Sequence, residues 1–135
     1  IDIMEMVGGS GLENRTVGTA HWNSGGTYQA DGVTKQPYAP ASFGDTKTLS
    51  GGETLANAFH VFSLVWTSSR LTWYIDDVQY HTMAINSGAE LSAFQKEFFL
   101  IFNVAVGGRW PGSPNSNTTF PQRMLVDYVR VFQEN

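Results

Sequence analysis

Two carboxylates stand in the first strand-like segment of the sequence, residues 1–7. Asp2 and Glu5 are three positions apart in Ile-Asp-Ile-Met-Glu-Met-Val, and all the remaining residues of this segment are apolar. A buried strand carries charge at a cost unless the charges are paired or do chemistry. Two carboxylates held near each other are candidates for general acid–base chemistry.

The spacing of Asp2 and Glu5 leaves two interpretations open. Residues three apart on a regular strand point to opposite faces, so the two carboxylates share a face only if a β-bulge near Ile3 or Met4 inserts an extra residue. Bulges are common next to active sites. In the alternative interpretation, Asp2 faces water at the chain end and Glu5 caps a loop.

Strands dominate the rest of the prediction, because β-branched and aromatic runs alternate with Gly, Asn, Pro and Ser. Asp76 and Asp77 form the two-residue turn of a hairpin. Residues 23–45 are predicted as loops with at most one short strand, and residues 87–94 have weak helical character. The predicted strands are residues 1–7, 16–22, 59–66, 71–75, 78–82, 98–104 and 124–132.

Composition indicates a single all-β domain over residues 1–135, an antiparallel β-sandwich or jelly roll. The chain is 41% hydrophobic and 13% aromatic, with 14 Gly and no internal repeat or linker. Ile1 is not a start Met and already reads as strand, so we expect the chain to begin inside a larger gene product.

Several functional classes are disfavoured. A net charge of −4 gives no basic face for phosphates, so we expect no nucleic-acid partner. No apolar run approaches the about 18 residues of a membrane span, so we expect no membrane partner. Without Cys, the chain has no disulfide, thiolate nucleophile or cysteine zinc site.

The carboxylate segment also carries a family resemblance. Residues 1–6 resemble the end of the Glu-Ile-Asp-Ile-Met-Glu signature of glycoside hydrolase family 16, in particular its laminarinase-like endo-β-1,3-glucanases. Further segments match the family's motifs in order: Gly-Thr-Ala-His-Trp at 18–22, Phe-His-Val-Phe at 59–62, Trp-Tyr-Ile-Asp at 73–76, Asn-Val-Ala-Val-Gly-Gly at 103–108, Trp-Pro-Gly at 110–112, Phe-Pro-Gln at 120–122 and Val-Asp-Tyr-Val-Arg-Val at 126–131.

The resemblance implies a jelly roll whose concave cleft hydrolyses β-1,3- or mixed-linked β-glucans with retention of configuration. In such enzymes one carboxylate attacks the anomeric carbon, and a second, about 5–5.5 Å away, protonates the leaving oxygen and then activates water. By motif position Glu5 is the general acid/base, and Asp2 is the middle Asp that tunes the site by like-charge proximity. The family's nucleophilic Glu would stand immediately before Ile1 and is not in this sequence.

The resemblance covers only the second half of the family domain. Two functions follow from it: a retaining glucanase, or a noncatalytic β-glucan-binding half-domain that lacks the nucleophile. Half of a jelly roll exposes strand edges, which a homodimer could cover. By resemblance the protein is extracellular.

A glucan cleft combines aromatic platforms for the apolar faces of sugars with polar side chains for their hydroxyls. The matched motifs supply candidate substrate-binding residues: His21, Trp22, Asn103, Arg109 and Trp110. We expect Trp66 and Trp73 to serve packing, and His60 and His81 to occupy ordinary strand positions.

The resemblance implies no cofactor for catalysis, but it does imply a structural calcium ion. The family counterpart of Asp127 helps to bind calcium on the convex face, through hard oxygen ligands. The alternative is a surface Asp127 or an ion pair with Arg130 or Arg123.

Overall fold

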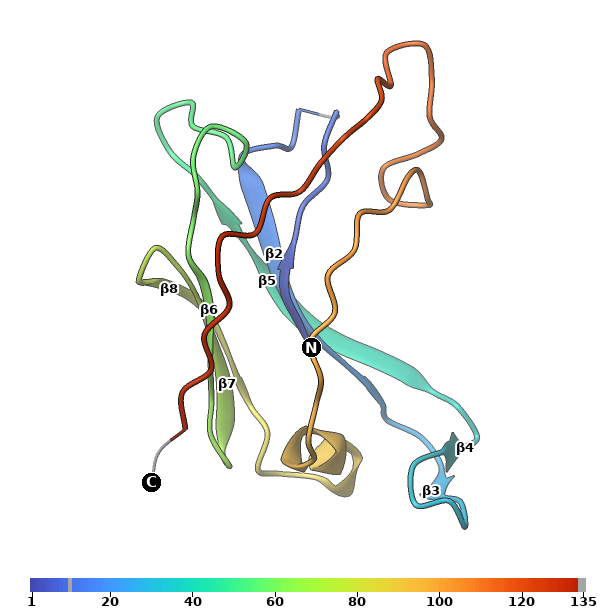
Figure 1. Cartoon of the computed structure of the whole chain (residues 1–135). Coiled ribbons are helices and arrows are strands. Elements are labelled where there is room, and N and C mark those ends of the chain that lie inside the picture. The colour runs from blue at the N-terminus through green and yellow to red at the C-terminus, as the bar shows by residue number, and fades with distance from the viewer. Residues whose placement is uncertain (10, 134–135) are drawn as a thin grey trace. The chain divides into compact units, whose positions relative to one another are not determined.

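The structure is a computed structural model that describes residues 1–9 and 11–133. The chain divides into two compact units, residues 1–99 and residues 100–135, which we call the first and second units. The regular strands among the described residues all lie in the first unit (Figure 1). The predicted single domain over residues 1–135 stays a prediction.

The first sheet is antiparallel, with the order β1 (Asp2–Glu5), β2 (Arg15–Asn23), β5 (Pro40–Thr48) (Figure 1). Along β2 the side chains alternate between two faces, as in any strand. Thr16 and Ala20 are fully buried on one face, and His21 is exposed on the other. The sheet therefore has one face toward the core and one toward solvent.

The second sheet joins β6 (Phe62–Trp66), β7 (Arg70–Ile75) and β8 (Val78–Ala84), also antiparallel. Asp76 and Asp77 connect β7 to β8 with positive φ angles of 48° and 64°. Two central residues of this kind make the tight turn whose twist suits a hairpin. The predicted hairpin is confirmed.

The core lies between these two sheets, with β1 near β6 and β5 near β8. Ala20 of β2 meets Leu71 and Trp73 of β7 in a buried cluster that also contains Phe94. Phe94 and Leu91 are the buried residues of η1, a 3-10 helix over Ala89–Gln95, where the sequence has helical character. The predicted fold class, an all-β antiparallel sandwich, is confirmed.

The prediction for residues 23–45 is wrong in part. This stretch contains the short hairpin β3 (Thr27–Tyr28) and β4 (Lys35–Gln36), and most of β5. Strand β5 has no apolar alternation because most of its nine residues are exposed. Its backbone pairs with β2 along the whole strand, so hydrogen bonding rather than side-chain burial forms it.

The predicted strands over residues 98–104 and 124–132 are also wrong for this structure. No regular strand is assigned among the described residues of the second unit. A strand needs a neighbour whose N–H and C=O groups pair with its own. Within residues 100–133 the one isolated bridge joins Gly108 to Gly112, and apolar side chains such as Ile101 and Phe132 are exposed.

None of the helical turns in the described ranges is long and apolar enough to cross a lipid bilayer.

Substitution of Phe94 tests whether the core lies where the structure places it. Its side chain is fully buried, whereas Phe59 is 70% exposed. We expect Phe94→Ala to lower the free energy of unfolding by about 3–5 kcal/mol, because truncation of a buried Phe leaves a cavity. Phe59→Ala, the matched control, should have little effect in the same urea titration. Equal effects of the two substitutions would contradict the assigned core.

Candidate active site

The pairing of β1 with β2 contains an extra residue. Asp2 lies opposite Thr19, and Glu5 lies opposite Val17, so β1 advances three positions where β2 advances two. This is the β-bulge that the spacing of the carboxylates requires. Residues opposite each other in an antiparallel pair share a face, and Thr19 and Val17 share one. Asp2 and Glu5 therefore point to the same face.

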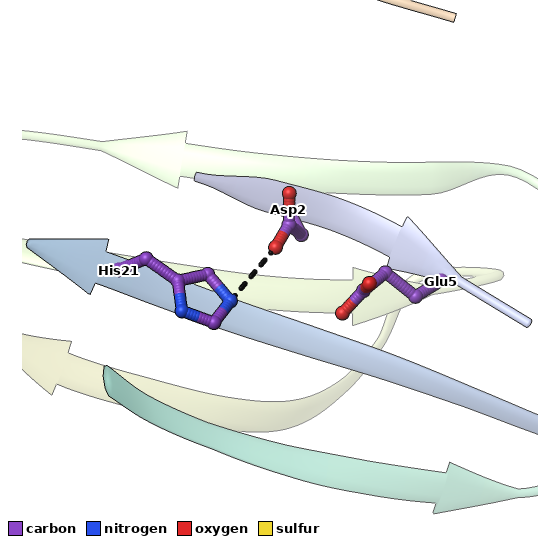
Figure 2. A group of neighbouring side chains, drawn as sticks. All are labelled: Asp2, Glu5 and His21. Atoms are coloured by element: carbon purple, nitrogen blue, oxygen red, sulfur yellow. Dashed lines mark ion pairs between the residues drawn. The ribbon is translucent and has the colours of Figure 1, made fainter. Parts of the chain in front are cut away.

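His21 joins the two carboxylates because it follows Thr19 by two positions on β2. One ligand-type atom of each side chain, two carboxylate oxygens and an imidazole nitrogen, lie within 4.8 Å of one another. Figure 2 shows the three side chains directed toward a common point. Nε2 of His21 is 3.0 Å from Oδ2 of Asp2. The structure thus gathers three predicted site residues from two strands.

The electrostatic environment favours the protonated form of Glu5. Partial burial raises the pKa of the Glu5 carboxyl above its ordinary value, and the negative charge of Asp2 raises it further. His21 acts in the opposite direction, and the net pKa is raised. A carboxyl group that keeps its proton to higher pH is suited to general acid catalysis.

Asp2, Glu5 and His21 are also the one group of three described side chains that could hold a metal ion. Asp127 lies outside any such group among the residues with assigned positions. Calcium takes about six to eight oxygen ligands, and carboxylates supply only part of such a set. The calcium site stays a prediction. The guanidinium of Arg130 lies 4.4 Å from the centre of the Tyr128 ring.

Trp22 is next to His21 on β2 and therefore points to the opposite face. Its ring packs edge-on against Phe94, with centroids 6.0 Å apart and planes at 71°. Within the described part of the chain, its buried Nε1 has no hydrogen-bond partner. The structure does not bring Trp22 to the carboxylates, and its role in substrate binding stays a prediction.

The other predicted sugar contacts, Asn103, Arg109 and Trp110, belong to the second unit. Gly108 and Gly112 exchange two backbone hydrogen bonds of 3.0 and 2.9 Å, which form a tight turn around Arg109 and Trp110. Trp110 is 54% exposed, so its ring is free to meet a ligand. These three assignments stay predictions.

Of the two tryptophans expected to serve packing, Trp73 is fully buried and confirms that expectation. Its Nε1 also donates a 3.0 Å hydrogen bond to the backbone oxygen of Asp2. Sequence reasoning missed this contact because it joins residues far apart in the chain. Trp66 remains 38% exposed, and its Nε1 donates to the backbone oxygen of Phe94 at 3.0 Å.

His81 lies within β8, as expected, and is buried. His60 precedes β6, so its predicted strand position is wrong. Nδ1 of His60 lies 2.7 Å from Oδ2 of Asp76. Burial opposes ionisation of Asp76, but the hydrogen bonds from His60 and Val61 outweigh it and hold the pKa of this carboxyl below its ordinary value. His60 thus has a structural partner at the hairpin turn.

Comparison with known proteins agrees with this geometry. The catalytic domain of the Thermotoga maritima laminarinase superposes with a TM-score of 0.61 at 35% identity, over 87% of this chain and 43% of that domain. The glucan endo-1,3-beta-glucosidase A1 of Niallia circulans is 34% identical over 99% of this chain and 19% of its own length. The beta-1,3-glucan-binding protein of Penaeus monodon is 31% identical over 80% of this chain and 33% of its own length.

The chain therefore spans less than half the length of each of these relatives. The sequence profile of glycosyl hydrolases family 16 matches residues 1–130, which is nearly the whole chain. Together with the antiparallel sandwich and the carboxylate pair on its bulged strand, this match shows that the protein belongs to glycosyl hydrolases family 16.

Proposed function

We propose that this chain carries the acid/base half of a glycoside hydrolase that cleaves β-1,3-glucans of the laminarin type, or mixed-linked β-glucans, with retention of configuration. The observation that carries the proposal is the bulged strand, which holds Asp2 and Glu5 on one face beside His21. The laminarinase and glucosidase relatives support this class of substrate. Catalysis of this kind uses no cofactor.

In the proposed mechanism Glu5 moves the protons. Its protonated carboxyl donates to the glycosidic oxygen as the bond to the anomeric carbon breaks, and its carboxylate then removes a proton from the attacking water. Asp2 raises the proton affinity of Glu5 through its charge, and its contact with His21 fixes its position. The attacking carboxylate corresponds to the position immediately before Ile1, outside this sequence.

One proposed substrate contact lies beside the carboxylates of the first unit. His21 is exposed beside the carboxylates, so its imidazole can form a hydrogen bond with a sugar hydroxyl. In the second unit, the family resemblance assigns sugar contacts to Asn103, Arg109 and Trp110. A polymeric glucan does not cross a membrane, which supports an extracellular protein. Association of two copies through exposed strand edges stays a prediction.

A second candidate function is glucan binding without hydrolysis. It is favoured by the similarity to the beta-1,3-glucan-binding protein of Penaeus monodon. This function needs the aromatic and polar contacts to sugar, but it needs no proton transfer by Glu5.

Glu5→Gln separates the two candidates. We expect it to reduce release of reducing sugar from laminarin by at least about a hundredfold, because the amide cannot donate the proton. Glucan binding and the thermal midpoint should stay close to those of the unchanged chain. The matched control is Glu53→Gln at an exposed position.

Full activity in Glu5→Gln would contradict the assignment of Glu5. Absence of turnover in every variant, with laminarin still retarding the chain in affinity electrophoresis, would favour the binding function.

Asp2→Asn tests the electrostatic role of Asp2. Because the charge of Asp2 raises the pKa of Glu5, its removal should lower that pKa, although burial still acts on Glu5. The basic limb of the pH profile of kcat/KM, where the general acid loses its proton, should therefore move to lower pH. NMR titration of the Glu5 carboxyl carbon measures the same pKa without substrate. Asp77→Asn, in the β7–β8 turn, should leave it unchanged, and an equal response would refute the role of Asp2.

Trp110→Ala tests whether the ring of Trp110, in the second unit, binds sugar. If the exposed ring stacks on sugar, its loss should weaken binding of laminari-oligosaccharides by about 1 kcal/mol or more in calorimetry. Trp110→Phe keeps an aromatic face and should retain most of the affinity. Unchanged affinity in Trp110→Ala would remove this residue from the binding surface.

A further inference from the structure

We propose that Trp73 is a positioning residue: its indole, seated on Gly18 and hydrogen-bonded to the backbone of Asp2, holds the β-bulge that brings Asp2 and Glu5 to one face. The inference rests on the proposed function for its catalytic consequence. The structural part of the inference is that one buried side chain maintains the bulge. Contacts within the first unit support this part, and it does not depend on the proposed function.

The bulge needs support because β1 is short and lies at one edge of its sheet. Strand β1 has four residues and pairs with β2 on one side. A regular pairing over the same stretch would turn one of the two carboxylates to the other face, because the side-chain period of a strand is two. The extra residue also interrupts the ladder of backbone hydrogen bonds. The sheet by itself therefore does not secure this geometry.

Trp73 supplies a contact from the opposite sheet. It lies on β7, is fully buried, and donates from Nε1 to the backbone oxygen of Asp2 at 3.0 Å. A buried N–H group that loses its acceptor is costly, so this bond resists movement of the Asp2 backbone. Asp2 and Glu5 flank the bulge, and the hydrogen bond from Trp73 therefore holds one of these two residues in place.

Gly18 provides the space for this indole. It stands on β2 between Val17 and Thr19, the partners of Glu5 and Asp2, and is therefore opposite the bulge. A Cβ atom at Gly18 would lie 2.5 Å from Cδ1 of Trp73 and 2.5 Å from Oη of Tyr80. Both contacts are far inside van der Waals distance. The lack of a side chain at Gly18 is what lets the indole approach β1.

Other aromatic rings pack against the indole. The ring centroids of His81 and Trp73 are 4.7 Å apart, and their planes make an angle of 36°. The ring centroids of Phe43 and His81 are 5.1 Å apart. Burial lowers the pKa of His81, which favours its neutral form. Because Asp2 and Glu5 point to the other face of the sheet, Trp73 acts on them through the backbone and does not touch substrate.

Trp73→Phe tests the proposal, since it keeps an aromatic ring and removes the N–H donor. We expect the bulge to relax and the carboxylates to separate, so the pKa of Glu5 should shift, because both its burial and its distance from the charge of Asp2 change. The contact between His21 and Asp2 should also loosen. NMR measures both without substrate: titration of the Glu5 carboxyl carbon reports its pKa, and the chemical shifts of the His21 ring at one fixed pH report its contact with Asp2. Where the chain hydrolyses laminarin, kcat should fall about tenfold to a hundredfold with little change in KM.

Trp66→Phe is the matched control. It removes an indole hydrogen bond of the same length to a backbone oxygen, that of Phe94, which is not part of the carboxylate site. It should lower stability but leave the Glu5 titration and the His21 ring shifts unchanged. If Trp73→Phe does not fold, replacement of Trp73 by benzothienylalanine exchanges only the N–H for sulfur, and the same measurements apply.

A Glu5 titration curve and His21 ring shifts that are identical in the folded Trp73 variant and the unchanged chain would overturn the proposal. A failure of the proposed function can be distinguished from a failure of the Trp73 proposal. In that case the unchanged chain does not hydrolyse laminarin, while the substrate-free measurements still report whether Trp73 holds the bulge.

Discussion

The candidate site depends on one extra residue in β1. The two-residue period of strands puts the core on one face of the first sheet and solvent on the other, and the same period would separate two carboxylates placed three positions apart. The bulge between Asp2 and Glu5 resolves this conflict within four residues. It leaves the register of β2 with β5 intact, so the core does not have to change to accommodate the site.

The bulge also creates the electrostatics of the site. Glu5 is partly buried and faces the charge of Asp2, and both conditions favour its protonated form. His21 moderates this effect, because it lies close to both carboxylates and contacts Asp2 at 3.0 Å. In the proposed mechanism this difference lets Glu5 hold a proton while Asp2 supplies a neighbouring charge.

The sequence was informative where local chemistry decides the structure. The hairpin at Asp76–Asp77 needs only turn-forming residues between two strands, and the bulge was recognisable as the condition under which Asp2 and Glu5 share a face. Strand β5 was not recognisable, because it forms by backbone pairing while its side chains stay exposed. Residues 124–132 have a strand-like composition, but composition does not supply the neighbouring strand that regular pairing needs.

The contact of Trp73 with Asp2 could not be identified from the sequence. Both residues belong to recognisable motifs, but the hydrogen bond joins two sheets across 71 positions. Gly18 gave a partial signal, since a glycine inside a strand often marks a close approach of other atoms. What the sequence does not give is which group approaches, and here it is the indole that reaches the bulge.

The same geometry bears differently on the two functions proposed for this chain. Two neighbouring carboxylates that repel each other, one of them partly buried, oppose stability, and such arrangements persist in proteins mainly where function requires them. A surface that binds neutral sugars gains nothing from a raised pKa at Glu5. Proton transfer to a leaving oxygen does gain from it, because the acid must hold its proton at the pH of the reaction. Of the two proposed functions, the catalytic one therefore makes use of the raised pKa of Glu5, and the binding one does not.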